Sequence, residues 1–293
     1  MANLKEIRNR IASVTSTRKI TSAMKMVAAA RLRKAQEAII QMRPYADRLH
    51  TILTNLSDSI RGEEDNPYAT ERDMEKVLIV VVSSNRGLCG AFNSLVIKRA
   101  MEVAYEDFGK LMQQRKVDFY AIGKRGSEFL RKNKYPLAGI KNELFDDLTF
   151  DNVMPVAEGI MDQFIAGEYD RVMLVYNQFK NAAVQILTTE QFLPVLIPEK
   201  TEEDSIFADY IYEPSKEFII RELIPRSLKI QFYKALLDSH AAEQGARMTA
   251  MHMATDNATD LLRELNLYYN KARQAAITSE LLEIVSGAEA LKG

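Results

Sequence analysis

The chain of 293 residues is 47% hydrophobic and 27% charged, with a net charge of −1, which is ordinary for a folded protein of about two domains. It contains no apolar run of about 18 residues or more, so no membrane-spanning helix is predicted. One cysteine excludes an internal disulfide, three scattered histidines exclude a His-rich metal site, and the basic N-terminus lacks the apolar core of a signal peptide.

The charges are unevenly spread along the chain. Residues 1–36 contain nine Lys or Arg and one Glu, whereas residues 199–217 contain seven Asp or Glu and two Lys. A basic helix suggests an acidic partner, which could be nucleic acid, anionic lipid or an acidic protein loop. A well-solvated helical face is the alternative interpretation.

The first segment, about residues 3–60, has the pattern of one long helix. Positions spaced alternately by three and four residues from Leu4 to Ile60 are apolar, except at Arg18, Thr21 and Lys25. More than seven such heptads favour a coiled coil over an ordinary amphipathic helix. Pro44 is expected to kink it.

The middle of the chain alternates strands and helices after a polar linker at 61–73. Strands are predicted at 76–84, 117–123, 169–179 and 182–195, and helices at 91–114, 124–133 and 152–167. The last two strands are predicted to be joined by a hairpin turn at Lys180-Asn181. This pattern indicates a small Rossmann-like α/β domain over 61–214, with an antiparallel addition at one side.

The end of the chain returns to a heptad pattern. The predicted buried positions of this helix are Met251, Ala254, Ala258, Leu261, Leu265, Tyr268, Ala272, Ala275, Ser279 and Leu282. The apolar faces of two such helices are buried most simply when the helices pack as an antiparallel pair. At ~1.5 Å per residue the helices would be about 85 and 110 Å long. The predicted fold class is therefore α/β, a long antiparallel coiled coil of residues 1–60 and 215–293 with the α/β domain inserted.

The motifs that suggest chemistry are incomplete. The stretch SSNRGLCGAFNS at 83–94 supplies Gly87 and Gly90 but lacks the middle glycine of a dinucleotide-binding turn. Gly123-Lys124 resembles the end of a phosphate-binding loop, but Arg125 stands where Ser or Thr is required. Cys89 has no histidine in the same segment, so a small packed residue is favoured over a nucleophile. No catalytic constellation, cofactor site or metal site is predicted.

Two alternatives remain open at this point. One is a nucleotide-dependent α/β enzyme that uses the turn at 83–94. The other is a basic coiled coil that binds nucleic acid, although residues 1–36 contain no aromatic side chain for stacking on bases.

Three stretches together resemble one known family. They are IRNRIASVTSTRKITSAMKMVAAARLRKAQ at 7–36, SSNRGLCGAFN at 83–93 and ATDNATDLLRELNLYYNKARQAAITSELLEIVSGAEAL at 254–291. In this order they resemble the γ subunit of F-type ATP synthase, and the likeness extends over nearly the whole chain.

The resemblance implies a rotor without an active site. Its expected partners are a ring of three α and three β subunits, the ε subunit and the membrane-embedded c-ring, and no nucleic acid. Rotation would couple ion flow to ATP synthesis or hydrolysis at the β subunits. One cysteine leaves no dithiol of the plastid type, which favours a bacterial protein at the cytoplasmic face of the inner membrane, with a processed mitochondrial chain as the alternative.

The resemblance also assigns residues to these partners. The expected contacts with β subunits are Met24, Lys25, Arg31, Arg33, Arg86, Cys89, Arg273 and Gln274. Thr278 and Glu280 are expected to couple the two shaft helices, and Tyr210, Tyr212 and Glu213 to meet the c-ring and ε. The two helices are expected to part where Arg18, Thr21 and Lys25 interrupt the apolar positions, leaving Met24 and Lys25 free for the β subunits.

Overall fold

The computed structural model describes residues 4–55, 67–70, 72–195 and 216–290. The chain divides into two compact units, each described here by itself. One, the helical unit, comprises residues up to 28 and from 248 onward. The other, the α/β unit, comprises residues 29–247.

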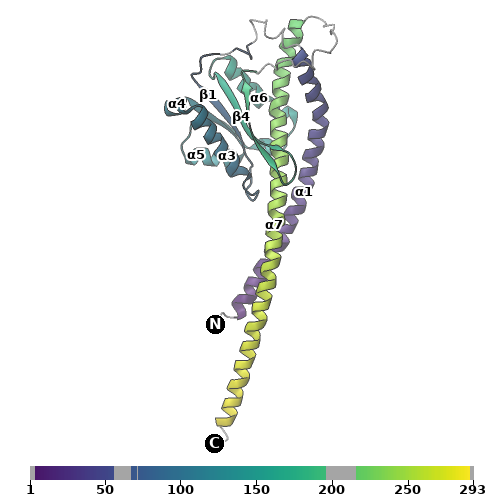
Figure 1. Ribbon diagram of the computed structural model, residues 1–293, viewed down its shortest axis with the longest axis vertical. Coiled ribbons are helices and arrows are strands. Elements are labelled where there is room, and N and C mark those ends of the chain that lie inside the picture. Colours follow the sequence, from purple (N-terminus) through teal and green to yellow (C-terminus); the bar gives the residue numbers. More distant parts are fainter. Residues whose placement is uncertain (1–3, 56–66, 71, 196–215, 291–293) are drawn as a thin grey trace. The chain divides into compact units, whose positions relative to one another are not determined.

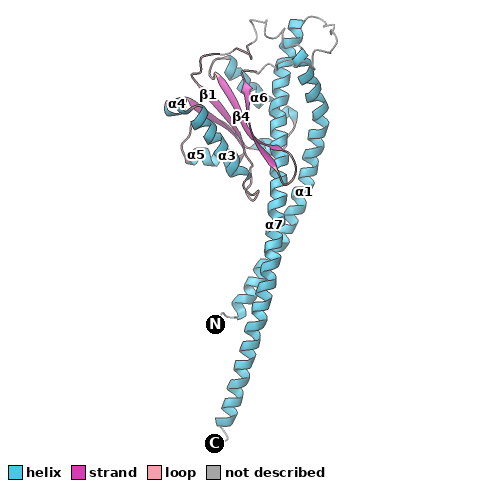
Figure 2. Ribbon diagram, in the orientation of Figure 1, coloured by secondary structure: helices cyan, strands magenta, loops and turns pink. Residues whose placement is uncertain are grey.

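The α/β unit is built on a five-stranded sheet (Figures 1 and 2). Its strands are β1 (Val77–Val82), β2 (Val117–Ile122), β3 (Leu137–Lys141), β4 (Arg171–Phe179) and β5 (Gln185–Leu193), in the spatial order β3-β2-β1-β4-β5. The first four are parallel, and β5 pairs antiparallel with β4. Every residue of β1 is buried, as expected for a central strand covered on both faces.

Helices cover both faces of this sheet. The helices α3 (Phe92–Glu102), α4 (Gly109–Gln113) and α5 (Lys124–Lys132) follow β1 and β2, and α6 (Phe150–Ile165) precedes β4. Val77, Ile79 and Val81 pack with α3, whereas the alternate residues of β1 pack with α6 and with residues 224–236 of the C-terminal helix. The predicted small α/β domain with an antiparallel addition is confirmed.

Three local features differ from the sequence-based prediction. Strand β3 was not predicted because it is a short edge strand without a buried run. The hairpin connection is residues 180–184 rather than a two-residue turn, since the side chain of Asn181 accepts hydrogen bonds from the amides of Ala183 and Val184. The single helix predicted over 91–114 is interrupted by a π-helical turn, Val103–Asp107.

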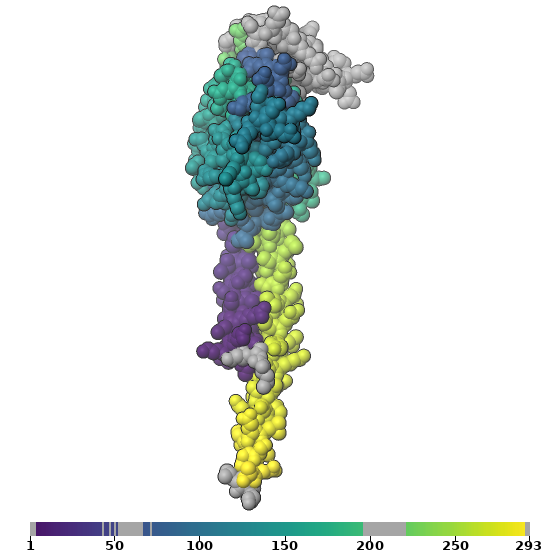
Figure 3. All heavy atoms as spheres, turned by 90° about the vertical axis from the view of Figure 1, so that its left-hand side faces the viewer, coloured from purple at the N-terminus to yellow at the C-terminus, as the bar shows by residue number. Residues whose placement is uncertain are grey.

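The two long helices are α1 (Leu4–Asn55) and α7 (Lys216–Ala290), and a short 3-10 turn, Glu143–Phe145, precedes α6. Each long helix continues through its proline, Pro44 or Pro225, and neither is apolar enough to span a membrane; the same holds for the other described helices. In the helical unit the N-terminal part of α1 lies along α7 (Figure 3). Arg8 bonds to Tyr269 and Thr21 to Thr255, so the pair is antiparallel, as predicted.

The buried face of α7 differs from the predicted heptad in phase. Met251, Ala258 and Leu265 are buried as expected, but Leu262 is 7% exposed while the predicted Leu261 is 36% exposed. The observed face therefore uses the residue four positions after Ala258 rather than three. Both spacings fit an apolar stripe on a helix, which is why the sequence did not distinguish them.

The predicted parting of the helices is wrong at Thr21. This residue is buried, and its hydroxyl lies 2.8 Å from the hydroxyl of Thr255. Each hydroxyl is also within hydrogen-bond distance of a carbonyl on its own helix, that of Arg18 or Met251. The polar residue Thr21 therefore holds the two helices in contact here instead of separating them.

Candidate functional site

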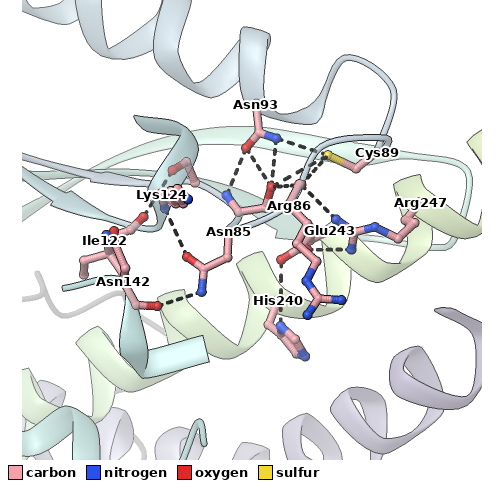
Figure 4. A network of polar contacts seen from close by, with 12 residues as sticks. Asn85, Arg86, Cys89, Asn93, Ile122, Lys124, Asn142, His240, Glu243 and Arg247 are labelled. Carbon is pink, nitrogen blue, oxygen red and sulfur yellow. Dashed lines mark hydrogen bonds and ion pairs between the residues drawn. The ribbon is translucent and has the colours of Figure 1, made fainter. Parts of the chain in front are cut away.

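The turn that follows β1, residues 83–91, is held in an unusual backbone conformation by its own side chains. Leu88 has φ of 63° and Gly90 has φ of 59°. The amide of Ser84 donates to the side chain of Asn93 at 2.9 Å, and the Ser84 hydroxyl donates to the carbonyl of Arg86 at 2.6 Å. These polar groups satisfy one another rather than being free to hold a phosphate (Figure 4).

Helix α7 is bonded directly to this turn through Arg247. One guanidinium nitrogen of Arg247 donates to the carbonyls of Arg86 and Gly87, at 3.0 and 3.3 Å. The other pairs with the carboxylate of Glu243, and both side chains are less than a tenth exposed. Cys89 and Phe92 pack against Ala242 beside this polar contact.

Residues 242–246 of α7 also pack against the end of β4 and the hairpin loop. Phe179 packs with the same cluster as Ala242 and Ala246. A Cβ added to Gly245 would lie 3.2 Å from the Cα of Ala182, so this glycine permits the close approach of loop and helix. In a doubly wound sheet, ligands bind beyond the carboxyl ends of the strands where the strand order reverses, here between β1 and β4. In this protein α7 fills that position.

The buried thiol of Cys89 is not activated for chemistry. Burial raises the pKa of Cys89, and the hydrogen bond with Ser84 and the charge of Arg247 offset this only in part. A neutral thiol is a poor nucleophile. The prediction of a small packed residue at this position is confirmed.

Charged groups from three elements converge beside the turn. Burial, together with Arg31, Arg247 and Lys34, lowers the pKa of His240 to about 4, so this imidazole is neutral near pH 7. Its Nδ1 has no hydrogen-bond partner among the described residues. Burial raises the pKa of Glu243, while Arg247, Arg31 and Arg86 act in the opposite direction.

This cluster brings together two residues that the resemblance assigns to β-subunit contacts. Arg31 on α1 and Arg86 on the turn are both exposed, and the charge of each acts on Glu243. Arg33, also assigned to β, is highly exposed and pairs with Glu37 on its own helix at 3.0 Å. Cys89 is buried, so its turn can reach a partner only through neighbouring residues such as Arg86 and Leu88.

The other assigned residues lie on the helical unit or outside the described residues. Met24 and Lys25 are half-buried on α1. On α7, Arg273, Gln274, Thr278 and Glu280 are exposed, and the Thr278 hydroxyl donates to the carbonyl of Gln274. Thr278 lies nine residues beyond Tyr269, whereas the described part of α1 begins only four residues before Arg8, so in this antiparallel register no described residue of α1 lies opposite Thr278. Tyr210, Tyr212 and Glu213 lie outside the described residues.

The last part of α7 is an exposed apolar surface. Ala275, Ser279 and Leu282 were predicted to lie in the buried face, but all three are exposed. Ile277, Leu281, Leu282, Ile284 and Val285 are between 49 and 67% exposed. Ile277, Leu281 and Ile284 follow helical spacing and form one stripe, called here the terminal stripe.

The sequence patterns did not identify His240, Glu243 or Arg247. A signal was available in the stretch DSHAAEQGAR at 238–247, where polar side chains recur at helical spacing among small residues. Such a pattern predicts one polar face on the helix, but it does not reveal that this face is buried or that its partner is a turn far away in the sequence. Among the described residues, no group of His, Cys, Asp and Glu could hold a metal ion.

Comparisons with known proteins agree over the whole chain. The family model described as ATP synthase matches residues 3–291. The ATP synthase gamma chain of Flavobacterium johnsoniae is 58% identical over 293 residues, covering 100% of both chains. That of Chlorobaculum tepidum is 45% identical over 292 residues, again covering 100% of both.

Solved structures agree as well. The central stalk and c-ring of Tetrahymena thermophila mitochondrial ATP synthase contains a chain that matches with a TM-score of 0.60 and 25% identity, covering 80% of this chain and 99% of that one. A chain of the Euglena gracilis mitochondrial ATP synthase matches with a TM-score of 0.66 and 21% identity, covering 98% and 94%. Because its identity is below 25%, the Euglena gracilis match supports the fold alone.

Proposed function

The chain belongs to the ATP synthase γ chain family, and from that premise we propose that it works as a rotor with no active site of its own. Its place is the central stalk, inside a ring of three α and three β subunits. Rotation of the stalk couples ion flow through the c-ring to ATP synthesis or hydrolysis at the β subunits.

The observation that carries this proposal is the terminal stripe. Ile277, Leu281 and Ile284 are exposed on a helix that is described with continuous geometry to Ala290. A contiguous apolar surface on a folded protein marks a site where another protein binds. A ring of subunits around this end of α7 would cover the stripe, and apolar contacts allow rotation because they impose few directional bonds.

The β subunits are proposed to contact polar residues as well as this stripe. Arg273 and Gln274 are exposed just before the stripe and are proposed to form hydrogen bonds with β. Met24, Lys25, Arg31, Arg33 and Arg86 are proposed to face acidic segments of the β subunits. The exposed guanidinium groups suit that role because arginine pairs with carboxylates in a two-bond geometry.

The absence of catalysis in this chain is supported by the packing of α7. The position where a doubly wound sheet binds a nucleotide is filled by Ala242, Gly245 and Ala246. The nucleotide-dependent enzyme considered from the sequence would need that space. ATP chemistry is therefore assigned to the α and β subunits.

The remaining partners are proposed from the family alone. Tyr210, Tyr212 and Glu213 are proposed to meet the c-ring and the ε subunit. Through these contacts the chain would be peripheral to the membrane, at the cytoplasmic face of the bacterial inner membrane.

The test is reconstitution with the α and β subunits. Adding the full chain is expected to raise their ATPase rate at least tenfold. The triple variant Ile277→Ser, Leu281→Ser, Ile284→Ser should keep the helix content of the free chain, because these side chains are exposed. It should lose most of the stimulation.

A second triple variant controls for the loss of apolar surface elsewhere. Leu95, Val184 and Ile186 are also 43 to 48% exposed, and they lie on the α/β unit. Their replacement by serine should leave the stimulation within about twofold of wild type. Equal losses in the two triple variants, or no stimulation by the wild-type chain, would contradict the proposal.

A further inference from the structure

We propose that Arg247 is a positioning residue that fixes the turn at 83–91 on residues 240–247 of α7, and thereby fixes the position of Arg86 for its partner. This inference rests on the proposed function, since it concerns how Arg86 is presented to the β subunits. It assigns Arg247 a role although its own side chain is buried.

The contact has the geometry of a clamp on the backbone. Arg247 donates to two successive carbonyls, those of Arg86 and Gly87, at 3.0 and 3.3 Å, and also pairs with Glu243 (Figure 4). A planar guanidinium has several N–H donors in a fixed arrangement and can make all three contacts at once. Glu243 is four residues earlier on the same helix and orients the guanidinium.

The contact with α7 adds to the hydrogen bonds of Ser84 and Asn93 in holding a backbone conformation that is unfavourable by itself. Leu88 has a positive φ, which side chains other than glycine rarely adopt, and it is 66% exposed. Packing of the Leu88 side chain therefore does little to maintain the conformation. If the turn moved away from α7, the carbonyl of Gly87 would lose its donor on α7, whereas that of Arg86 would keep the Ser84 hydroxyl.

The clamp leaves the charge of Arg86 available. Arg247 binds the carbonyl of Arg86, not its guanidinium, and the positive charge of Arg247 is balanced by Glu243. Arg86 is therefore an exposed cation at the turn. Its backbone is fixed while its side chain can bind an acidic partner.

The chain contains its own reporter for this contact. Cys89 is the single cysteine, lies inside the turn and is buried. Its sulfur is 3.2 Å from the side-chain amide of Asn93. A thiol reagent added to the full chain therefore labels Cys89 only when the turn opens.

The first experiment measures that labelling rate in three variants. Arg247→Lys keeps the charge but cannot reach Glu243 and both carbonyls together, so labelling should become at least tenfold faster. Glu243→Gln keeps the two carbonyl contacts, so the rate should stay within threefold of wild type. Arg263→Lys is the control on an exposed arginine of the same helix, and no change is expected.

Low concentrations of urea separate local opening from general unfolding. A local opening exposes little surface, so its rate should depend weakly on urea, whereas global unfolding depends steeply on it. Fast labelling of Arg247→Lys that is nearly independent of urea supports the clamp. An unchanged rate overturns it, and so does a rate with the urea dependence of global unfolding. Equal acceleration in Glu243→Gln also overturns the clamp, because it would show that the ion pair, not the carbonyl contacts, holds the turn.

The second experiment tests whether Arg247 acts through Arg86. ATPase rates of the complex with α and β are compared for Arg86→Ala, Arg247→Lys and the double variant. Each single variant should reduce the stimulation, and the double variant should be within twofold of Arg86→Ala, because residues that act as a unit are not additive. Losses that multiply, or no loss in Arg247→Lys, overturn the positioning role. If the wild-type chain fails to stimulate α and β, the proposed function fails, while the labelling rates still decide the clamp.

Discussion

Burial beside charged groups shifts the pKa values of individual residues in the α/β unit, and His240 is the clearest example. His240 is mostly buried, stacks on Phe145 with ring centroids 5.9 Å apart, and lies 3.9 Å from a carboxylate oxygen of Glu243. The groups that face it are Arg31 and Lys34 from α1, and Glu243 and Arg247 from its own helix. Burial and three cations outweigh one carboxylate, so the imidazole stays neutral.

This arrangement predicts a loss of stability in mild acid. The pKa of His240 is about 4 in the folded protein, below the 6.5 of the unfolded chain. Between these values the unfolded state binds a proton that the folded state does not, so stability falls as the pH falls. The loss between pH 7 and pH 5 should be about 2 kcal/mol, measured from urea unfolding followed by circular dichroism.

The variant His240→Gln should remove most of that difference. Glu243 acts in the opposite sense, because its raised pKa favours proton uptake by the folded state at the acidic end. His252→Gln is the control, since His252 is exposed beside Asp256. If His240→Gln and wild type lose the same stability between pH 7 and pH 5, the imidazole is not the group responsible.

The sequence could identify the exposed candidates more easily than the buried ones. Arg86 and Arg273 were found because they belong to stretches that resemble a family. Arg247 could not be identified because its role depends on hydrogen bonds to the carbonyls of Arg86 and Gly87. Every residue has a backbone carbonyl, so the sequence does not show which carbonyls accept a hydrogen bond from a distant side chain. Leu88 was missed for a related reason, since leucine gives no signal for a positive φ.

At the scale of the elements, the pairing of α1 with α7 includes one polar contact within an apolar face. Thr21 and Thr255 satisfy each other and also lie near carbonyls of their own helices. A hydroxyl left buried without a partner costs free energy, whereas replacing both partners with apolar groups of similar shape is close to neutral.

The contact can therefore be tested as a pair. Thr21→Val and Thr255→Val should each reduce the free energy of unfolding by about 1 kcal/mol. The double variant should be close to wild type, and so less destabilised than the sum of the two. Chemical denaturation of the full chain measures all three.

Thr17→Val provides the control for this set. Thr17 is exposed on the same helix and bonds to the carbonyl of Ser13, so its replacement should change stability by less than about 0.5 kcal/mol. Additive losses in the double variant would show that the two hydroxyls do not act together.

The apolar repeat of the two long helices predicts their existence and pairing, but not every buried position. The apolar repeat predicted both long helices and their antiparallel pairing. It assigned Leu261 and Tyr268 to the buried face of α7, but Leu262 is buried and Tyr268 is 51% exposed. Leucines and tyrosines occur in adjacent pairs at these positions, so hydrophobicity alone fits either phase. Which residue is buried depends on the partner helix.

At the scale of the whole molecule, the resemblance seen in three stretches is confirmed. The family model matches residues 3–291, and the Flavobacterium johnsoniae relative is 58% identical along its full length. The fold class is also confirmed. The residue assignments stay predictions, because contacts with β subunits, the c-ring and ε depend on surfaces of other chains.

One such assignment can be examined in the assembled enzyme. Arg273→Ala should change the stability of the free chain by less than about 0.5 kcal/mol, because Arg273 is exposed. In membrane vesicles with the complete complex, it should lower the amount of ATP synthesised for a given ion gradient, since an interaction with β is lost.

Arg263→Ala is the matched change on the same helix. Arg263 is exposed and pairs with Asp260, and its replacement should leave synthesis unchanged. Equal synthesis in the Arg273→Ala and wild-type complexes would remove Arg273 from the proposed contact.

The helical unit joins the two ends of the chain, and this has a consequence for biosynthesis. Thr21 and Thr255 are separated by 234 positions. At a synthesis rate of about 5 to 20 residues per second, the first helix would wait roughly 10 to 50 s for its partner. During that time its apolar face has no intramolecular cover in the helical unit, and the α/β unit can begin to fold first. A nascent chain of this protein is therefore expected to need protection at its N-terminus until the last helix leaves the ribosome.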